Sequence, residues 1–157
     1  MHITNEGGRI AMVIKPKEYT YQTQLEWLSE KKGTLHSNGK PSMMVACPPE
    51  FGGHPNIWTP EDLFVASIEV CIMTTFLYFI KNKKINLLSY KSQTKGTASM
   101  VNYKFQFSSI HIHLDITVST GMEKDAITEI LKKVENHCLI SQSVKSQLTI
   151  TADINIG

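Results

Sequence analysis

The sequence is poor in residues on which several classes of protein depend. Among 157 residues there is one arginine, Arg9, and the formal net charge is only +2. Arginine makes the two-pronged contacts that read phosphates and base edges, so we expect no nucleic-acid partner. Three cysteines, Cys47, Cys71 and Cys138, are too few for a disulfide framework.

The N-terminus also lacks the basic stretch and apolar run of a secretory signal. We therefore expect a cytoplasmic protein with reduced thiols. The longest mostly apolar run, residues 63–80, carries Glu69 near its middle. A charge at the centre of a membrane span costs about 2.5–3.5 kcal/mol, so we interpret this run as a soluble protein's helix and expect no membrane partner.

The length is typical of a single domain, which we assign to residues 1–157, with residues 1–18 as an irregular start. Alternating apolar residues and β-forming side chains predict strands along much of the remainder. An Asn-Gly pair, Asn38-Gly39, predicts the turn of an early hairpin. The predicted strands are 20–28, 33–36, 42–46, 85–98, 102–118 and 148–156, with a further short candidate at 9–14.

Helix signals occur at two places. Thr59 is a favourable N-cap, Pro60 suits the first helical position, and Asp62 completes a capping-box pattern. These residues predict a helix from there to about residue 83. Apolar residues at helical spacing predict a second helix over 122–137, and one more turn is predicted over 141–145.

The resulting order, β-β-β-α-β-β-α-β, indicates an α+β fold with long antiparallel strands. The first helix is apolar on nearly every face, and one small sheet can cover only one of them. We therefore expect a second subunit to cover the rest, in an obligate dimer.

Two cysteines fall on the two predicted helices: Cys71 in the middle of the first and Cys138 at the end of the second. If the fold brings them together, they can carry out dithiol redox chemistry. Buried free cysteines are also common as inert core residues, and that reading stays open. Cys47, beside two prolines in a loop, is interpreted as structural.

Two segments carry a family resemblance: PEDLFVASIEVC at 60–71 and HCLIS at 137–141. They resemble the OsmC/Ohr superfamily, the osmotically inducible and organic hydroperoxide resistance proteins. The Pro- and Gly-rich loop at 47–53 is similar to the one that precedes this helix in Ohr-type members. The resemblance covers roughly residues 20–157.

The resemblance implies an intertwined homodimer with central helices and a thiol peroxidase acting on small organic hydroperoxides. Cys71 would be the peroxidatic cysteine, Cys138 the resolving cysteine, and Glu61 the carboxylate that holds a catalytic arginine. The reductant would be an external dithiol, with a lipoyl-bearing protein as one candidate. No bound cofactor and no metal are expected.

One departure concerns that arginine. The corresponding early segment reads SEKKG at 29–33, so either Lys31 or Lys32 replaces it or nothing does. Moreover, Glu61 and Cys71 are ten residues apart on one helix, which is about 15 Å along the axis. We therefore expect Glu61 of one subunit to meet Cys71 of the other, or a long cation to bridge them.

Other readings stay open. A non-catalytic dimer that binds a small apolar ligand is the main alternative, and a thiol redox sensor is another. His111 and His113 alternate on one strand, which favours an exposed sheet face over a metal site. Glu69, within an apolar helix, needs a partner or a wet cavity.

Overall fold

The N-terminal part of the chain forms a small antiparallel sheet. A computed structural model describes residues 17–157, so the strand predicted at 9–14 lies outside the described residues. Strands β1 (Gln24–Ser29), β2 (Lys32–His36) and β3 (Met43–Ala46) pair in that order. β1 begins later than predicted because β2 ends at His36, which pairs with Gln24, and leaves residues 20–23 without a pairing strand.

A compact loop joins this sheet to the first long helix. It contains a single 3₁₀ turn, η1 (Pro49–Phe51), and folds back on itself where the amide of His54 donates to the carbonyl of Cys47 at 3.0 Å. A Cβ at Gly53 would overlap that carbonyl oxygen, so only glycine fits there.

Helix α1 (Pro60–Lys83) begins at the predicted cap. The amide of Asp62 donates to Thr59 Oγ1 at 3.1 Å, and the amide of Thr59 donates to Asp62 Oδ2 at 3.0 Å. These two bonds form the reciprocal capping box that the sequence predicts. By length and composition alone α1 could also cross a membrane, a property that core helices of soluble proteins share.

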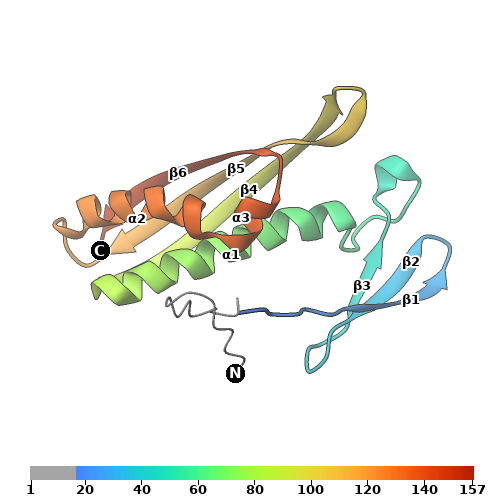
Figure 1. Ribbon diagram of the computed structural model, residues 1–157, viewed down its shortest axis with the longest axis horizontal. Helices are drawn as coiled ribbons and strands as arrows, with labels where there is room; N and C mark the ends of the chain where they lie inside the picture. The colour runs from blue at the N-terminus through green and yellow to red at the C-terminus, as the bar shows by residue number, and fades with distance from the viewer. Residues whose placement is uncertain (1–16) are drawn as a thin grey trace, which may run out of the picture.

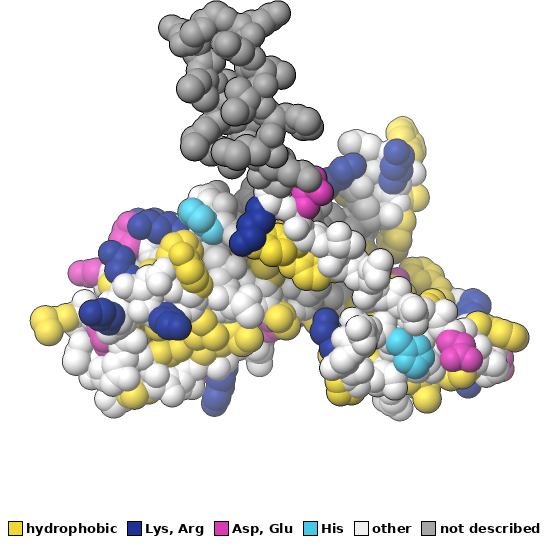
Figure 2. Space-filling model, turned by 60° about the horizontal axis from the view of Figure 1, so that its bottom comes forward, with side chains coloured by type: hydrophobic (Ala, Val, Ile, Leu, Met, Phe, Trp, Pro, Cys, Tyr) yellow, Lys and Arg dark blue, Asp and Glu magenta, His cyan; other side chains and the backbone are white. Residues whose placement is uncertain are grey.

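Within residues 17–157, the buried residues of α1 all lie on one face. Its buried residues follow one another at intervals of four: Ile68, Ile72, Phe76 and Ile80. On other faces Val70 is 54% exposed and Tyr78 is 62% exposed. Figure 2, which brings the lower side of Figure 1 forward, shows apolar side chains gathered across this side of the molecule. The helix is thus apolar beyond what its own sheet can cover.

The second sheet consists of β4 (Leu87–Val101), β5 (Lys104–Val118) and β6 (Gln147–Ile156), in that order. β4 and β5 form a long antiparallel hairpin, as predicted, but β6 runs parallel to β5. Helices α2 (Glu123–His137) and α3 (Leu139–Ser143) make the crossover that parallel strands require, and α1 and α2 lie on the same side of the sheet (Figure 1).

The core forms where this sheet meets the helices. β5 contributes a buried residue at every second position, from Ile110 to Val118. Ile127, Ile130 and Val134 of α2 are buried against the same cluster. The alternate residues of β5 point outward: His111 is exposed, and His113 lies 3.4 Å from Asp153 of β6. Among residues 17–157 no group of three side chains is arranged to hold a metal ion.

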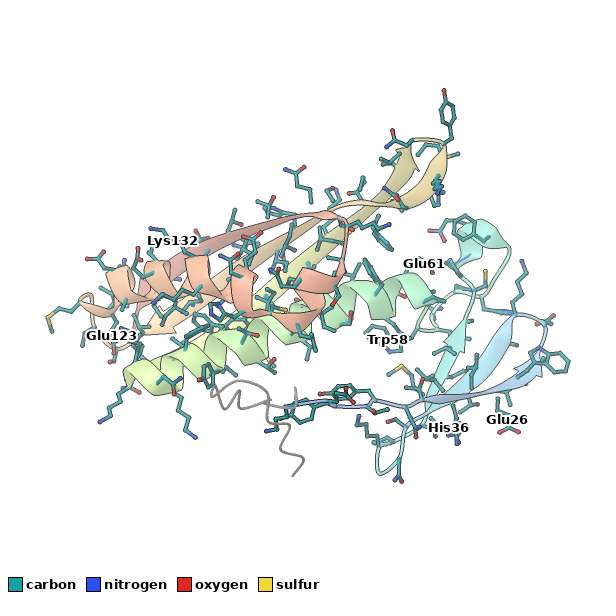
Figure 3. The ribbon with its side chains drawn as sticks, in the orientation of Figure 1. Glu26, His36, Trp58, Glu61, Glu123 and Lys132 are labelled. Atoms are coloured by element: carbon teal, nitrogen blue, oxygen red, sulfur yellow. The ribbon has the colours of Figure 1, made fainter. Side chains whose placement is uncertain are left out.

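Glu123 joins two turns at the far end of the molecule from Glu61 (Figure 3). Its Oε1 accepts from the amide of Asn86 at 3.0 Å, and its Oε2 accepts from the amide of Thr120 at 3.1 Å and the hydroxyl of Ser119 at 3.3 Å. The hydrogen bond from Asn86 is the largest of the effects that lower the pKa of this carboxyl below its ordinary value. The carboxylate therefore ties the α1–β4 turn to the β5–α2 turn.

We predict that Glu123→Gln lowers the urea midpoint of unfolding at pH 7. Because the folded-state pKa of Glu123 is depressed, its contribution is present above the unfolded value near 4.3 and is lost as pH falls through the folded value. The difference between variant and wild type should therefore shrink on acidification below about pH 4. Glu135→Gln, on the exposed face of α2, is the matched control. A difference that is the same at pH 7 and pH 3 would contradict this role.

Candidate active site

The fold brings Cys71 and Cys138 together at the junction of α1, α2 and α3. Cys71 lies on α1, half-buried at the edge of the core cluster to which the fully buried Cys138 belongs. Cys138 ends α2 with extended backbone angles and caps α3, where the amide of Ser141 donates to its sulfur at 3.4 Å. This cap starts α3 two residues before the predicted turn.

The surroundings of Cys71 hold its thiol in the neutral form. Burial raises the pKa of Cys71 above its ordinary value, and the facing Cys138 side chain raises it further. A hydrogen bond from the backbone amide of Ile140 and one from the hydroxyl of Thr75 act in the opposite direction without cancelling the shift. Since the thiolate is the nucleophile, the raised pKa leaves a smaller fraction of Cys71 in the reactive form at neutral pH.

Glu61 stands apart from this pair. It lies in the first turn of α1, at the end nearest the first sheet (Figure 3). Its Oε2 is buried and has no hydrogen-bond partner among the described residues. Glu61 borders two pockets, of about 590 Å³ and about 430 Å³, and neither is lined by Cys71. One chain therefore does not bring this carboxylate to the thiols, in keeping with the helical rise between them.

The two lysines predicted to replace the family arginine have other partners. Lys31 Nζ donates to the carbonyl of Phe51 at 2.5 Å, and Lys32 pairs with Glu30 at 3.5 Å. Within residues 17–157, neither lysine forms an ion pair with Glu61. No other lysine among residues 17–157 forms an ion pair with Glu61 either.

Two groups beside Cys71 were not predicted from the sequence. Thr75 follows Cys71 by four residues, and helical spacing alone could have identified it. The amide of Ile140 could not be found in this way. It reaches Cys71 only because the chain breaks from helical geometry at Cys138 and starts a new turn there.

We predict that the alkylation rate of Cys71 by iodoacetamide rises with pH through a midpoint above that of a free cysteine, near 8.5. Replacing the facing thiol in Cys138→Ala should lower this midpoint, since Cys138 raises the pKa of Cys71. Both measurements use a Cys47→Ser background and mass spectrometry of the Cys71 peptide. A midpoint below 8 in the parent protein would show that a cation from outside the chain's described residues reaches Cys71.

Comparison with known structures shows the same fold in several bacterial proteins. An OsmC-like protein of unknown function from Vibrio cholerae aligns with a TM-score of 0.81 and 14% identity, covering 87% of this chain and 100% of that one. An organic hydroperoxide resistance protein from Elizabethkingia anophelis aligns with a TM-score of 0.69 and 20% identity, covering 91% of this chain and 100% of that one. An organic hydroperoxide resistance protein from Legionella pneumophila aligns with a TM-score of 0.65 and 17% identity, covering 90% of this chain and 100% of that one.

Comparison with curated protein sequences gives no match. A family model, described as OsmC-like protein, matches residues 53–153. This match spans α1 with Cys71, the β4–β5 hairpin, the crossover with Cys138 and most of β6. The predicted fold class and family are therefore confirmed, and the chain belongs to the OsmC-like family.

Proposed function

We propose that this protein is a thiol peroxidase that reduces organic hydroperoxides as a cytoplasmic homodimer. The observation that carries the proposal is the juxtaposition of Cys71 with the buried Cys138 at the junction of three helices. Two structural relatives bear the name organic hydroperoxide resistance protein, which agrees with this chemistry.

In the first step the Cys71 thiolate attacks the terminal oxygen of the hydroperoxide. An S–O bond forms, the O–O bond breaks, and the leaving alkoxide takes up a proton to become an alcohol. Cys71 is then a sulfenic acid. The Cys138 sulfur attacks it, an S–S bond forms, and water leaves. An external dithiol, for which a lipoyl-bearing protein is a candidate, reduces the disulfide and closes the cycle.

The chain's own donors assist both thiols. The amide of Ile140 and the hydroxyl of Thr75 stabilise negative charge on Cys71, and the amide of Ser141 donates to the sulfur of Cys138. These groups orient the thiols but leave the pKa of Cys71 raised. The reaction is accordingly slow at neutral pH, and it accelerates as pH rises until Cys71 is ionised.

The exposed apolar residues of α1 support the proposed homodimer. A second copy of α1 packed there would bury Val70, Leu77 and Tyr78, which are exposed in the described part of the chain. Crossing helices would also let Glu61 of one subunit approach Cys71 of the other. Shared residues of this kind would complete the site that one chain leaves divided.

A second candidate function is the binding of an apolar ligand without catalysis. The pocket of about 590 Å³ beside Glu61 is lined in part by Phe51, Phe105 and Phe107, which suit an aromatic or aliphatic guest. The raised pKa of Cys71 favours this candidate, because a neutral thiol is a poor nucleophile.

Peroxidase activity predicts stoichiometric thiol loss. All variants carry Cys47→Ser, so that Cys71 and Cys138 are the two thiols of the parent protein. When the reduced parent is mixed with cumene hydroperoxide, it should lose both thiols, counted with a thiol reagent after quenching. Cys71→Ser should keep its remaining thiol, whereas Cys138→Ser should stop at a sulfenic acid that dimedone traps. Survival of both thiols at excess peroxide, at pH 7 and pH 9 alike, would remove the peroxidase and favour the ligand-binding dimer.

If α1 packs against a second copy, a charged residue on its exposed apolar face should weaken the dimer. Val70→Asp should shift the protein from dimer to monomer, or raise its dissociation constant at least tenfold, because it places a carboxylate in an apolar interface. Sedimentation velocity over a concentration series measures this. Thr128→Asp, on the exposed side of α2, is the control. A wild type that is monomeric at all concentrations would contradict the dimer.

A further inference from the structure

The turn that joins α2 to α3 contacts both thiols. The backbone amide of Ile140 hydrogen-bonds to the sulfur of Cys71. The next amide along the chain, that of Ser141, donates to the sulfur of Cys138 at 3.4 Å. The hydroxyl oxygen of Ser141 is three covalent bonds from this amide nitrogen. Ser141 therefore follows directly the residue that contacts one thiol and itself contacts the other.

The hydroxyl of Ser141 has no partner of its own. Its oxygen is buried, and no hydrogen-bonding atom among residues 17–157 pairs with it. Ser143, on the same short helix, shows the ordinary arrangement: it is exposed, and its hydroxyl donates to the carbonyl of Leu139 at 2.8 Å. A buried hydroxyl without a partner costs free energy, so its presence beside two thiols calls for a physical reason.

Capping of α3 does not supply that reason. In a capping box, the side chain at the third helical position bonds back to the amide of the N-cap residue. Ser141 occupies the third position after the N-cap Cys138. The amide of Cys138, however, already donates to the carbonyl of Val134 at 3.0 Å. The hydroxyl of Ser141 is therefore left free for a partner that the reduced protein lacks.

The chemistry proposed above brings a new oxygen atom to this junction. When Cys71 is oxidised to a sulfenic acid, its sulfur carries a hydroxyl group. The new oxygen is one bond from a sulfur that the amide of Ile140 already holds against the turn. An interaction that is made only after oxidation lowers the barrier of the following step instead of stabilising the reduced protein.

We propose that the Ser141 hydroxyl donates a hydrogen bond to the oxygen of the Cys71 sulfenic acid and so promotes resolution by Cys138. The Cys138 sulfur loses its proton and attacks the Cys71 sulfur. An S–S bond forms, the S–O bond breaks, and the departing hydroxide takes up the proton that Cys138 gave up and leaves as water. Ser141 stabilises the negative charge that develops on this oxygen. The role rests on the proposed peroxidase function and adds a third side chain to its resolving step.

The experiment measures how the sulfenic acid partitions between two fates. Reduced Cys47→Ser protein, the parent, is mixed with cumene hydroperoxide and dimedone at pH 8, and mass spectrometry gives the ratio of dimedone adduct to disulfide. In Ser141→Ala this ratio should rise about tenfold, because closure of the disulfide is slower. The rate at which Cys71 is first oxidised should stay unchanged.

Three matched variants separate this role from a structural one. Ser141→Thr keeps the hydroxyl and should return the ratio toward that of the parent. Ser143→Ala removes an exposed hydroxyl of the same helix and should match the parent. Ser141→Ala combined with Cys138→Ser, in which closure is absent, should react with dimedone as fast as Cys138→Ser alone. An unchanged ratio in Ser141→Ala, or an equal rise in Ser143→Ala, would overturn the proposal.

A second oxidant distinguishes failure of this proposal from failure of the peroxidase. Hydrogen peroxide in large excess at pH 9 converts an ionised thiol to a sulfenic acid without a substrate site. If cumene hydroperoxide leaves both thiols intact, the peroxidase fails, while the same ratio measured with hydrogen peroxide still tests Ser141. If neither peroxide yields a dimedone adduct in Cys138→Ser, both proposals fail.

The reduced protein gives a further check. Because no hydrogen bond joins the Ser141 hydroxyl to Cys71 before oxidation, Ser141→Ala should leave the alkylation midpoint of Cys71 where it is in the parent. Circular dichroism spectra should also coincide. A shifted midpoint would contradict a partner that is present only after oxidation.

Discussion

The parallel pairing of β6 with β5 is the constraint on which the arrangement of this protein depends. Parallel neighbours cannot be joined by a tight turn, so the chain must cross back over the sheet before β6 begins. The crossover is α2, whose buried residues Ile127, Ile130 and Val134 pack on the sheet beside α1. Its end delivers Cys138 to the flank of α1 that carries Cys71. The topology of the sheet thus creates the thiol pair.

The burial that holds the two thiols together also raises the pKa of Cys71. An apolar junction favours the neutral form of Cys71, and the short helix α3 offers only backbone amides in compensation. In most reactive cysteine sites a cation performs this task. The described chain supplies no arginine, and Lys31 is held by the carbonyl of Phe51. Among residues 17–157 the pair of thiols is therefore present without a cation beside Cys71.

Helix α1 serves a different purpose on each side. One stripe, with Ile68 and Ile72, anchors it to the core, and a second side presents Cys71 to α3. The side toward β4 carries Glu61 and Glu69, which border the pocket of about 430 Å³. The remaining side exposes apolar side chains in the described part of the chain (Figure 2). This division explains why a helix that is apolar almost all round still contains Glu61, Glu69 and Cys71.

The sequence by itself determined the elements whose signals are local. The capping residues Thr59 and Asp62 located the start of α1, and the alternation in β5 identified which side chains face the core. The family resemblance rested on the same short segments. These signals depend on a few neighbouring residues, so they can be recognised in the sequence without knowledge of the fold. For the same reason β1 was placed too early, since its start depends on where its pairing strand ends.

Only the tertiary structure decided what lies next to what. The parallel direction of β6, the contact of Ile140 with Cys71, and the separation of Lys31 and Lys32 from Glu61 all depend on segments distant in the chain. The pocket of about 430 Å³ beside Glu61 likewise forms only after α1 has packed on β4. Such contacts form when burial of apolar surface repays the entropy of closing long loops, and no local pattern encodes that balance.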